Sequence, residues 1–253
     1  MAVQYTYVMK GLTKTFPGAN KPVLNNIHLQ FIPGAKIAII GPNGAGKSTT
    51  FNLISGYMKP TTGTILLNGQ DIVGLPPFQI NRRGLSRSFQ VTNVFAKMTV
   101  WENLRCAVLW ATGHRYAFWK NVDALPEVRE RTAQILQDIS LVSRRDVPAG
   151  LLTYAEQRAL EIGITIAGGA DVILLDEPTA GMSHAETERA VEQIRRLTEG
   201  RTLLIVEHDM SVVFGLADRI SVLVYGEVIA TGTPDEIRGN RKVKEAYLGE
   251  EAA

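Results

Sequence analysis

Short apolar runs alternate with longer segments of helical period along most of the chain. Four runs are short, β-branched and almost entirely apolar, as expected of central strands that are covered on both faces of a sheet. These runs lie at residues 36–40, 172–176, 202–206 and 220–225. The first ~35 residues instead alternate apolar and polar positions, which is typical of half-buried strands. The pattern predicts an α/β domain with a parallel core and antiparallel strands before it.

Between residues 95 and 165 the strand signals fade and a helical pattern takes over. One apolar stripe at helical spacing is formed by Val128, Ile135, Leu136 and Ile139. We therefore expect a single domain over residues 1–253, with a helical subdomain inserted at 95–165. Two further helices are expected to begin after Ser183 and Thr233, because each is followed three residues later by a glutamate that can complete a capping box.

Composition narrows the class of protein. The chain has 253 residues, of which 45% are hydrophobic, so it can bury a sizeable core. Its 27 basic and 25 acidic residues supply no broad cationic field, which disfavours a nucleic-acid partner. No apolar run reaches the ~18 residues of a membrane span and the N-terminus does not resemble a signal peptide, so a cytosolic chain is expected. The single cysteine, Cys106, lies in an apolar stretch and is expected to be a buried, inert thiol.

The strongest chemical signal is a glycine-rich loop with the pattern G-x-x-x-x-G-K-[ST], placed directly between an apolar strand and a helical run. In such a loop, backbone N–H groups converge on phosphate oxygens and the following helix adds its partial positive charge. Lys47 would reach the β and γ phosphates, and Ser48 would ligate Mg²⁺. A glycine-rich surface turn is the alternative. The residues expected around the phosphates are Gly41, Pro42, Asn43, Gly44, Ala45, Gly46, Lys47, Ser48 and Thr49.

Two later strands end in polar residues. Asp176 and Glu177 follow one apolar run, and His208 follows the next. Parallel sheets gather ligands at the carboxyl ends of their strands, so Asp176 can hold magnesium, Glu177 can activate a water, and His208 can donate to the γ phosphate. The alternative is that the acids cap the next helix and that His208 only precedes an Asp209 helix cap.

In this order the motifs resemble those of the nucleotide-binding subunits of ABC transporters, over essentially the whole chain. The glutamine loop of that family matches residues 88–90, which end in Gln90. Its D-loop matches residues 180–183, and its switch histidine matches His208. The aromatic that stacks on adenine would be Phe16, for which ordinary core packing is the alternative. The signature loop of the family looks like residues 152–156.

Within the family, the segments GLSRSFQ, MTVWENL, LTYAEQRALEIG, DEPTAGM, VEHDM and GTPDEIRGNRKVKEAYLGE resemble the ATPase subunits of bacterial high-affinity branched-chain amino acid importers. Related members serve urea or lipopolysaccharide transport. The sequence departs from the family pattern at two positions. Ala155 stands where the signature loop usually has glycine, and His184 stands where this subgroup often has proline or aspartate.

The resemblance implies a P-loop NTPase core of RecA-like fold, with an N-terminal antiparallel β subdomain and an inserted helical subdomain. It implies ATP and Mg²⁺ as ligands. Glu177, His208 and Gln90 would act in catalysis, and Ser48, Gln90 and Asp176 would hold the metal. Gln90 could otherwise be an exposed loop residue.

The family also implies a set of partners. A second ATPase subunit, either identical or paralogous, would pack head to tail with this chain. Thr153 and Ala155 would then contact the ATP of the partner, and Thr153 could equally form a plain capping box with Glu156. A transmembrane permease, and through it a solute-binding protein, would hold the subunit at the cytoplasmic face of the inner membrane.

Two other classes compete with a transport ATPase. A soluble ABC ATPase acting on DNA or ribosomes usually carries tandem cassettes or coiled coils, and this chain has no heptad tract. A small-molecule kinase would need an arginine-rich lid, whereas Arg82, Arg83 and Arg87 precede a helical insertion. Four aromatic residues could pack the subdomain, which is the favoured interpretation, or face the permease: Trp110, Tyr116, Phe118 and Trp119.

Overall fold

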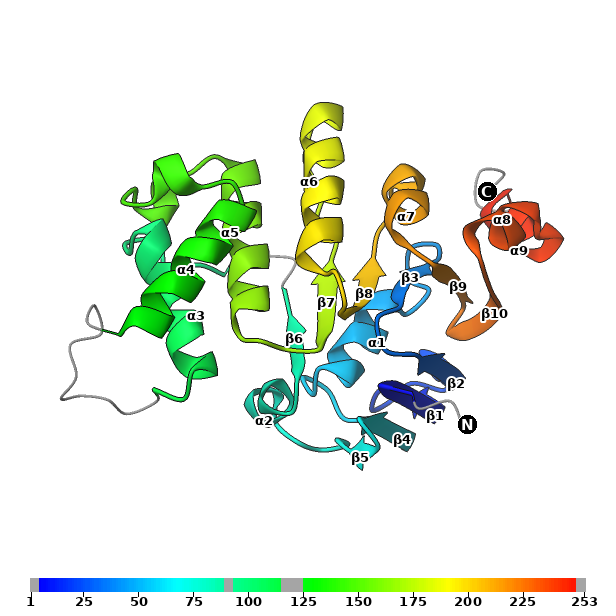
Figure 1. Ribbon diagram of the computed structural model, residues 1–253. Helices are drawn as coiled ribbons and strands as arrows, with labels where there is room; N and C mark the ends of the chain where they lie inside the picture. The colour runs from blue at the N-terminus through cyan, green and yellow to red at the C-terminus, as the bar shows by residue number, and fades with distance from the viewer. Residues whose placement is uncertain (1–4, 89–92, 115–124, 249–253) are drawn as a thin grey trace.

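Two β-sheets organise the protein (Figure 1). The computed structural model describes residues 5–88, 93–114 and 125–248. One sheet is antiparallel, with the strand order β2-β1-β4-β5. Its strands are β1 Tyr7–Lys14, β2 Leu24–Phe31, β4 Thr62–Leu67 and β5 Gln70–Asp71. The early antiparallel strands are confirmed. The pattern did not predict β4 because its first three residues are exposed and leave too short an alternation.

The second sheet has the strand order β10-β9-β3-β8-β7-β6. All neighbouring pairs are parallel except β9 and β10. Its strands are β3 Lys36–Ile40, β6 Leu85–Arg87, β7 Val172–Asp176, β8 Thr202–Val206, β9 Arg219–Val224 and β10 Glu227–Gly232. Three of the four predicted runs coincide with strands residue for residue, and the fourth is shifted by one residue. The edge strands β6 and β10 were missed, because one is very short and the other is half exposed.

The parallel sheet separates two apolar cores. In β3, Ile37 and Ile39 face the core shared with the antiparallel sheet and α1 (Lys47–Ile54), whereas Ala38 and Ile40 face the core shared with the helices of the opposite side. This alternation follows from the two-residue period of a strand. Because both faces are covered, the central strands are apolar almost throughout, and polar side chains concentrate at the strand ends.

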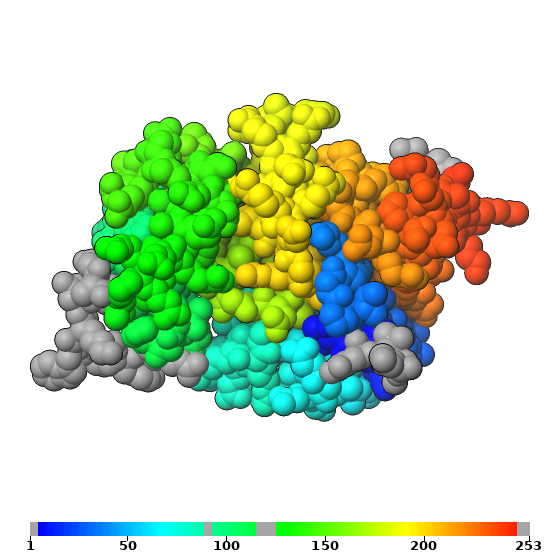
Figure 2. All heavy atoms as spheres, in the orientation of Figure 1, coloured from blue at the N-terminus to red at the C-terminus, as the bar shows by residue number. Residues whose placement is uncertain are grey.

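Helices cover the parallel sheet, and a group of helices lies beyond its edge strand β6 (Figure 1). The remaining α-helices of the described residues are α2 Pro77–Arg82, α3 Val100–Ala111, α4 Pro126–Asp138, α5 Tyr154–Ala167, α6 His184–Leu197, α7 Met210–Leu216, α8 Pro234–Gly239 and α9 Arg241–Leu248. The group α3, α4 and α5 packs together beyond β6 and lies against α6, as Figure 2 shows for one face. These helices fall in or next to the predicted insertion at 95–165, whose boundaries stay a prediction. No helix of the described ranges is long and apolar enough to span a membrane.

Capping boxes fix the starts of several helices. Both predicted boxes are confirmed: Ser183 exchanges hydrogen bonds with Glu186 before α6, and Thr233 does so with Glu236 before α8. Thr153 begins α5 in the same way. Each box satisfies N–H groups that have no partner inside the helix.

The expectation of a buried cysteine is wrong, because Cys106 is exposed on α3. The buried positions of this helix include Val100, Leu104 and Val108, which repeat every four residues. A residue two positions after Leu104 lies about 200° further around a helix of 3.6 residues per turn. The apolar stretch therefore turns its cysteine outward.

Candidate functional site

The glycine-rich loop between β3 and α1 is held in narrow space. A Cβ atom on Gly41 would collide with the carbonyl oxygen of Leu223 in β9. Gly46 has a φ of 103°, in the left-handed region, and a Cβ atom there would lie 2.6 Å from Cδ2 of Leu24. Only glycine lacks a Cβ atom and adopts a left-handed φ at low energetic cost. The loop is therefore fixed between β9, β2 and the start of α1.

Lys47 places its charge directly over this loop. Its buried Nζ atom donates to the carbonyl oxygens of Gly41, at 2.6 Å, and Pro42, at 3.0 Å. The hydroxyl-bearing Ser48 follows on the exposed side of α1, and Thr49 is partly buried. The N-terminus of α1 adds its partial positive charge at the same point. An ammonium group, a hydroxyl and a helix N-terminus thus converge, which is an arrangement suited to phosphate groups.

The strand order brings the other predicted residues to the same edge. β3 pairs with β8, and β8 pairs with β7, all in parallel. The loop after β3, His208 after β8, and Asp176 with Glu177 at the end of β7 therefore lie at the carboxyl ends of three adjacent strands (Figure 1). Ligands of open α/β sheets bind at this edge. The structure thus groups residues that the sequence separates by more than a hundred positions.

Asp176 is a buried carboxylate with a buried cationic partner. Its Oδ2 atom lies 2.9 Å from a terminal nitrogen of Arg87 in β6, and its backbone N–H donates to the hydroxyl of Ser88 at 3.3 Å. Burial raises the pKa of the Asp176 carboxyl above its usual value, and the neighbouring guanidinium of Arg87 opposes that rise. An aspartate and a serine hydroxyl are hard oxygen donors of the kind that Mg²⁺ prefers when phosphates supply further ligands. Asp176 and Ser48 therefore fit a magnesium ion.

Asp176 contacts β6, whereas Glu177 contacts β8 and the segment after it, on the other side of β7. The Oε1 atom of Glu177 lies 3.1 Å from Nε2 of His208, and its backbone N–H donates to Val206 in β8 at 2.9 Å. Its φ of 48° is left-handed, which is uncommon for a glutamate and is typical of residues held in place at functional sites. The two adjacent acids thus have different partners. The carboxylate of Glu177 and the imidazole of His208 lie within reach of one another and of solvent.

Glu207 belongs to this edge and was not predicted from the sequence. It is buried, and its carboxylate accepts hydrogen bonds from Thr179 N at 2.9 Å, Thr179 Oγ1 at 2.6 Å and its neighbour His208 N at 3.1 Å. It joins the segment after Glu177 to the segment that carries His208. The sequence signal for Glu207 was its position directly after an apolar strand. The functional role was assigned to the neighbouring His208 instead.

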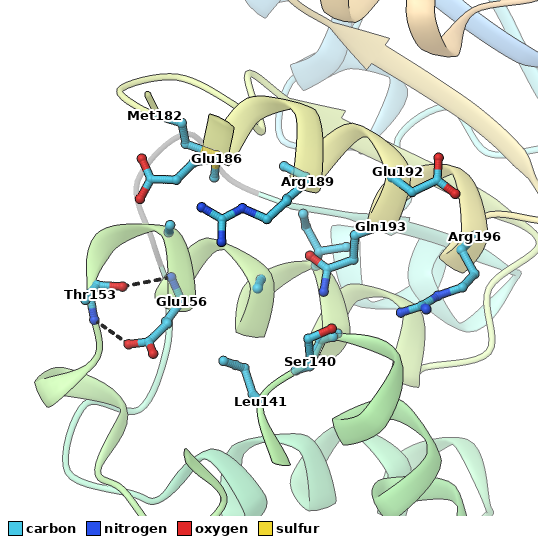
Figure 3. A pocket seen from close by; sticks show the side chains of 15 residues that line it. Ser140, Leu141, Thr153, Glu156, Met182, Glu186, Arg189, Glu192, Gln193 and Arg196 are labelled. Carbon is cyan, nitrogen blue, oxygen red and sulfur yellow. Dashed lines mark hydrogen bonds between the residues drawn. The ribbon is translucent and has the colours of Figure 1, made fainter. Parts of the chain in front are cut away.

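The predicted signature residues lie at the start of α5. Thr153 is exposed and Ala155 is partly buried, and both line a groove of 490 Å³ between α5 and α6. Figure 3 shows the two capping hydrogen bonds between Thr153 and Glu156 at one end of this groove, with side chains of α6 such as Arg189 across from them. Ala155 lies in the first turn of a regular helix.

This helix start touches the predicted D-loop. Gly181 has a φ of 76°, and a Cβ atom there would lie 3.4 Å from the ring of Tyr154. Tyr154 in turn accepts a hydrogen bond from Nε of Arg158, at 3.1 Å. The unexpected His184 is the first residue of α6 and is exposed, 3.6 Å from Glu188. It leaves the capping box of Ser183 intact.

The remaining predicted residues lie in the loop after β1 or outside the described residues. Phe16 lies in the turn after β1 with 37% of its surface exposed and Nζ of Lys14 5.4 Å from its ring centre, so it is not a core residue. Gln90 lies outside the described residues, as do Tyr116, Phe118 and Trp119.

A second groove, of 590 Å³, separates α2 and β6 from α3. Its walls include Tyr57, Phe78 and Trp110. The guanidinium of Arg82 lies 5.0 Å from the ring of Phe78 and 4.5 Å from that of Trp110. Core packing, expected for Trp110, is therefore wrong: the side chain is half buried and forms a groove wall. Arg87, the partner of Asp176, also lines this groove.

The parallel sheet, the phosphate-type loop and the acids at the neighbouring strand ends define a P-loop NTPase. The sequence matches the ABC transporter family over residues 24–180 and a branched-chain amino acid ATP-binding cassette transporter family over residues 227–253. The chain therefore belongs to the ABC transporter family, as an ATPase of the ATP-binding cassette type.

Relatives of known function cover nearly the whole chain. The high-affinity branched-chain amino acid transport ATP-binding protein LivG of Escherichia coli K12 is 41% identical, covering 96% of this chain and 97% of its own. BraF of Pseudomonas aeruginosa, described in the same words, is 37% identical over the same shares. The lipopolysaccharide export ATP-binding protein LptB of Haemophilus influenzae is 30% identical, covering 92% of this chain and 93% of its own.

Solved structures agree with the fold. The ADP conformation of MJ1267, an ATP-binding cassette of an ABC transporter, superposes with a TM-score of 0.83 at 26% identity and covers 97% of this chain and 99% of its own. A dimeric post-hydrolysis state of the cassette MJ0796, bound to ADP and phosphate, gives a TM-score of 0.76 at 25% identity, covering 90% and 98%.

Proposed function

We propose that this chain binds and hydrolyses ATP to energise an importer of branched-chain amino acids, or of a related small polar solute, through a separate permease. The observation that carries the proposal is the combination of the sheet-edge site with similarity to LivG and BraF over nearly the whole chain. The match over residues 227–253 supports the same subgroup. In this arrangement the permease and a binding protein would contact the solute and select it, and this chain would supply the energy.

The proposed roles follow from the contacts. Lys47, held over the loop by two carbonyl groups, would exchange them for phosphate oxygens. Ser48 and Asp176 would hold magnesium together with Gln90, and the ion would supply charge neutralisation at the phosphates. Glu177 would orient the attacking water and accept its proton, and His208 would position Glu177 and donate to the γ phosphate. Phe16 would stack on the base.

The site on one chain is proposed to be incomplete. Thr153 and Ala155 would act on the ATP of a second ATPase subunit, head to tail, with the N-terminus of α5 aimed at its γ phosphate. Exposure of Thr153 and of the neighbouring Tyr154 is consistent with such a contact. The dimeric MJ0796 structure supports the arrangement by similarity.

We propose that a permease segment seats in the groove between α2 and α3. Its exposed aromatic rings offer apolar contact area, and Arg87, which lines the groove, is paired with Asp176. The permease would hold the chain at the cytoplasmic face of the membrane and connect it to a solute-binding protein. A nucleic-acid partner is not proposed, since the formal net charge is only +2.

The similarity to LptB supports a second candidate, a related ABC system that moves lipopolysaccharide. A system for urea is an alternative of the same kind. A soluble ABC ATPase is a third. Purification of the chain from its native membranes with any permease that accompanies it, followed by reconstitution in proteoliposomes, separates them. We expect ATP-dependent uptake of labelled leucine or isoleucine that a Glu177→Gln complex does not support. Recovery of the chain without a permease, or leucine uptake that is absent while another solute moves, would overturn the branched-chain assignment.

A further inference from the structure

Arg87 joins three elements beneath the phosphate edge. One terminal nitrogen lies 2.9 Å from Oδ2 of Asp176 at the end of β7, and the other lies 2.8 Å from both Oδ1 of Asn52 and the hydroxyl of Ser55. Asn52 is in α1 and Ser55 is its C-terminal cap. The guanidinium therefore ties the helix that follows the phosphate loop to the strand that carries the proposed metal carboxylate.

The surroundings make this contact rigid. The side chains of Arg87 and Asp176 are only 9% and 6% exposed. The guanidinium also lies 5.6 Å from the ring of Phe51 and 5.7 Å from the ring of Tyr57. A planar guanidinium uses its two ends for different partners, which a lysine ammonium cannot do in the same geometry. Charge-assisted hydrogen bonds of this kind are short and directional.

We propose that Arg87 is a positioning residue that orients the Asp176 carboxylate for the magnesium ion of the bound nucleotide. The inference rests on the proposed function, because it takes Asp176 as a magnesium ligand. Arg87 holds Oδ2 and thereby sets the direction of Oδ1. It also sets the spacing between β7 and α1, the element on which Ser48 lies. Partners that orient metal ligands affect affinity strongly, and their loss typically weakens metal binding by about 10- to 100-fold.

The test is the magnesium dependence of nucleotide binding, which does not require turnover. A fluorescent ATP analogue is titrated with the purified chain in EDTA, and MgCl₂ is then varied at fixed nucleotide. For Arg87→Gln we expect the Mg²⁺ concentration for half-maximal binding to rise about 10- to 100-fold, with affinity in EDTA within about twofold of wild type. Arg87→Lys restores the charge but not the bridge and should recover only part of this shift.

The matched control is Arg83→Gln, which removes an exposed arginine that does not line this groove. It should leave the magnesium midpoint unchanged. A merely structural role of Arg87 would lower thermal stability and weaken binding equally with and without magnesium. If Arg87→Gln does not fold, Arg87→Lys carries the test, and a midpoint within twofold of wild type in that variant overturns the proposal.

Failure of this inference can be told from failure of the proposed function. Two results together would contradict the nucleotide site itself. In the first, wild type binds the analogue equally well with and without magnesium, and in the second, Lys47→Ala binds it as tightly as wild type does. Wild-type binding that needs magnesium, together with an unshifted midpoint in Arg87→Gln, would contradict only the role of Arg87.

Discussion

The sheet edge and the start of α5 both carry residues proposed to touch ATP, but they are built differently. At the sheet edge, Lys47 and Asp176 are buried and held by loop carbonyls and by Arg87. At the start of α5, Thr153 is exposed and its side chain caps its own helix. A preorganised edge and an exposed helix terminus suit different tasks, because fixed groups can orient chemistry whereas an exposed terminus can recognise a second molecule.

The largest expected effect tests the chemistry of the edge. Glu177→Gln should lower steady-state phosphate release by about 100-fold or more, because a positioned general base typically contributes 10²- to 10⁴-fold. ATP affinity should be kept, since the amide changes charge but hardly size. Phosphate release by the purified chain is the measurement, with the exposed surface variant Glu188→Gln as control. Substantial hydrolysis by Glu177→Gln would refute the assignment.

The next effect separates binding from chemistry at the same edge. Lys47→Ala should weaken ATP binding by about 10- to 100-fold, because a hydrogen bond to a charged group contributes about 1.5–3 kcal/mol. Equilibrium binding of a fluorescent ATP analogue measures it. Lys36→Ala, at the other end of β3, is the matched control and should bind normally. If wild type and Lys47→Ala bind ATP with equal affinity, the proposed contact between Lys47 and the phosphates is wrong.

Substitutions of two equivalent helix N-cap residues, Thr153 and Thr233, test the exposed start of α5. Thr153→Ala and Thr233→Ala each break a capping box and should each cost about 1 kcal/mol of folding stability. Only Thr153→Ala should also weaken the MgATP-dependent dimer, by about tenfold, because α5 alone is proposed to face the partner. The dimer is followed by light scattering in the Glu177→Gln background. A dimer weakened equally by both variants would mean that the helix starts act only through stability.

The smallest effect concerns Ala155, one of the two residues that depart from the family pattern. Ala155 lies in the first turn of α5. A methyl group suits the helix there but would obstruct the proposed close approach of phosphate. Ala155→Gly should raise ATPase activity modestly, by less than about tenfold, which corresponds to ~1.4 kcal/mol of barrier. Hydrolysis by the reconstituted complex measures it. An unchanged or lower rate would show that the methyl group does not hinder the closed dimer.

The central strands and the phosphate loop could be predicted because their signals are local. Uninterrupted β-branched runs arise where a strand is covered on both faces, and the loop pattern follows from the backbone conformations that glycine allows. Capping boxes are equally local, which is why the starts of α6 and α8 were found. Short or half-exposed strands such as β6 and β10 have no comparable pattern, since neighbours outside the segment hold them in the sheet.

By itself the sequence determined which residues are candidates for the chemistry, because a loop, a strand end and a cap each depend on neighbours a few positions apart. Only the tertiary structure decided which of them meet and what holds them. Arg87 forms an ion pair with Asp176, 89 positions away in the sequence, and Glu207 accepts a hydrogen bond from Thr179, 28 positions away. Such buried pairs form where strand order brings distant segments together and low solvent exposure demands that every charge have a partner. The pattern of a single strand contains no information about that partner.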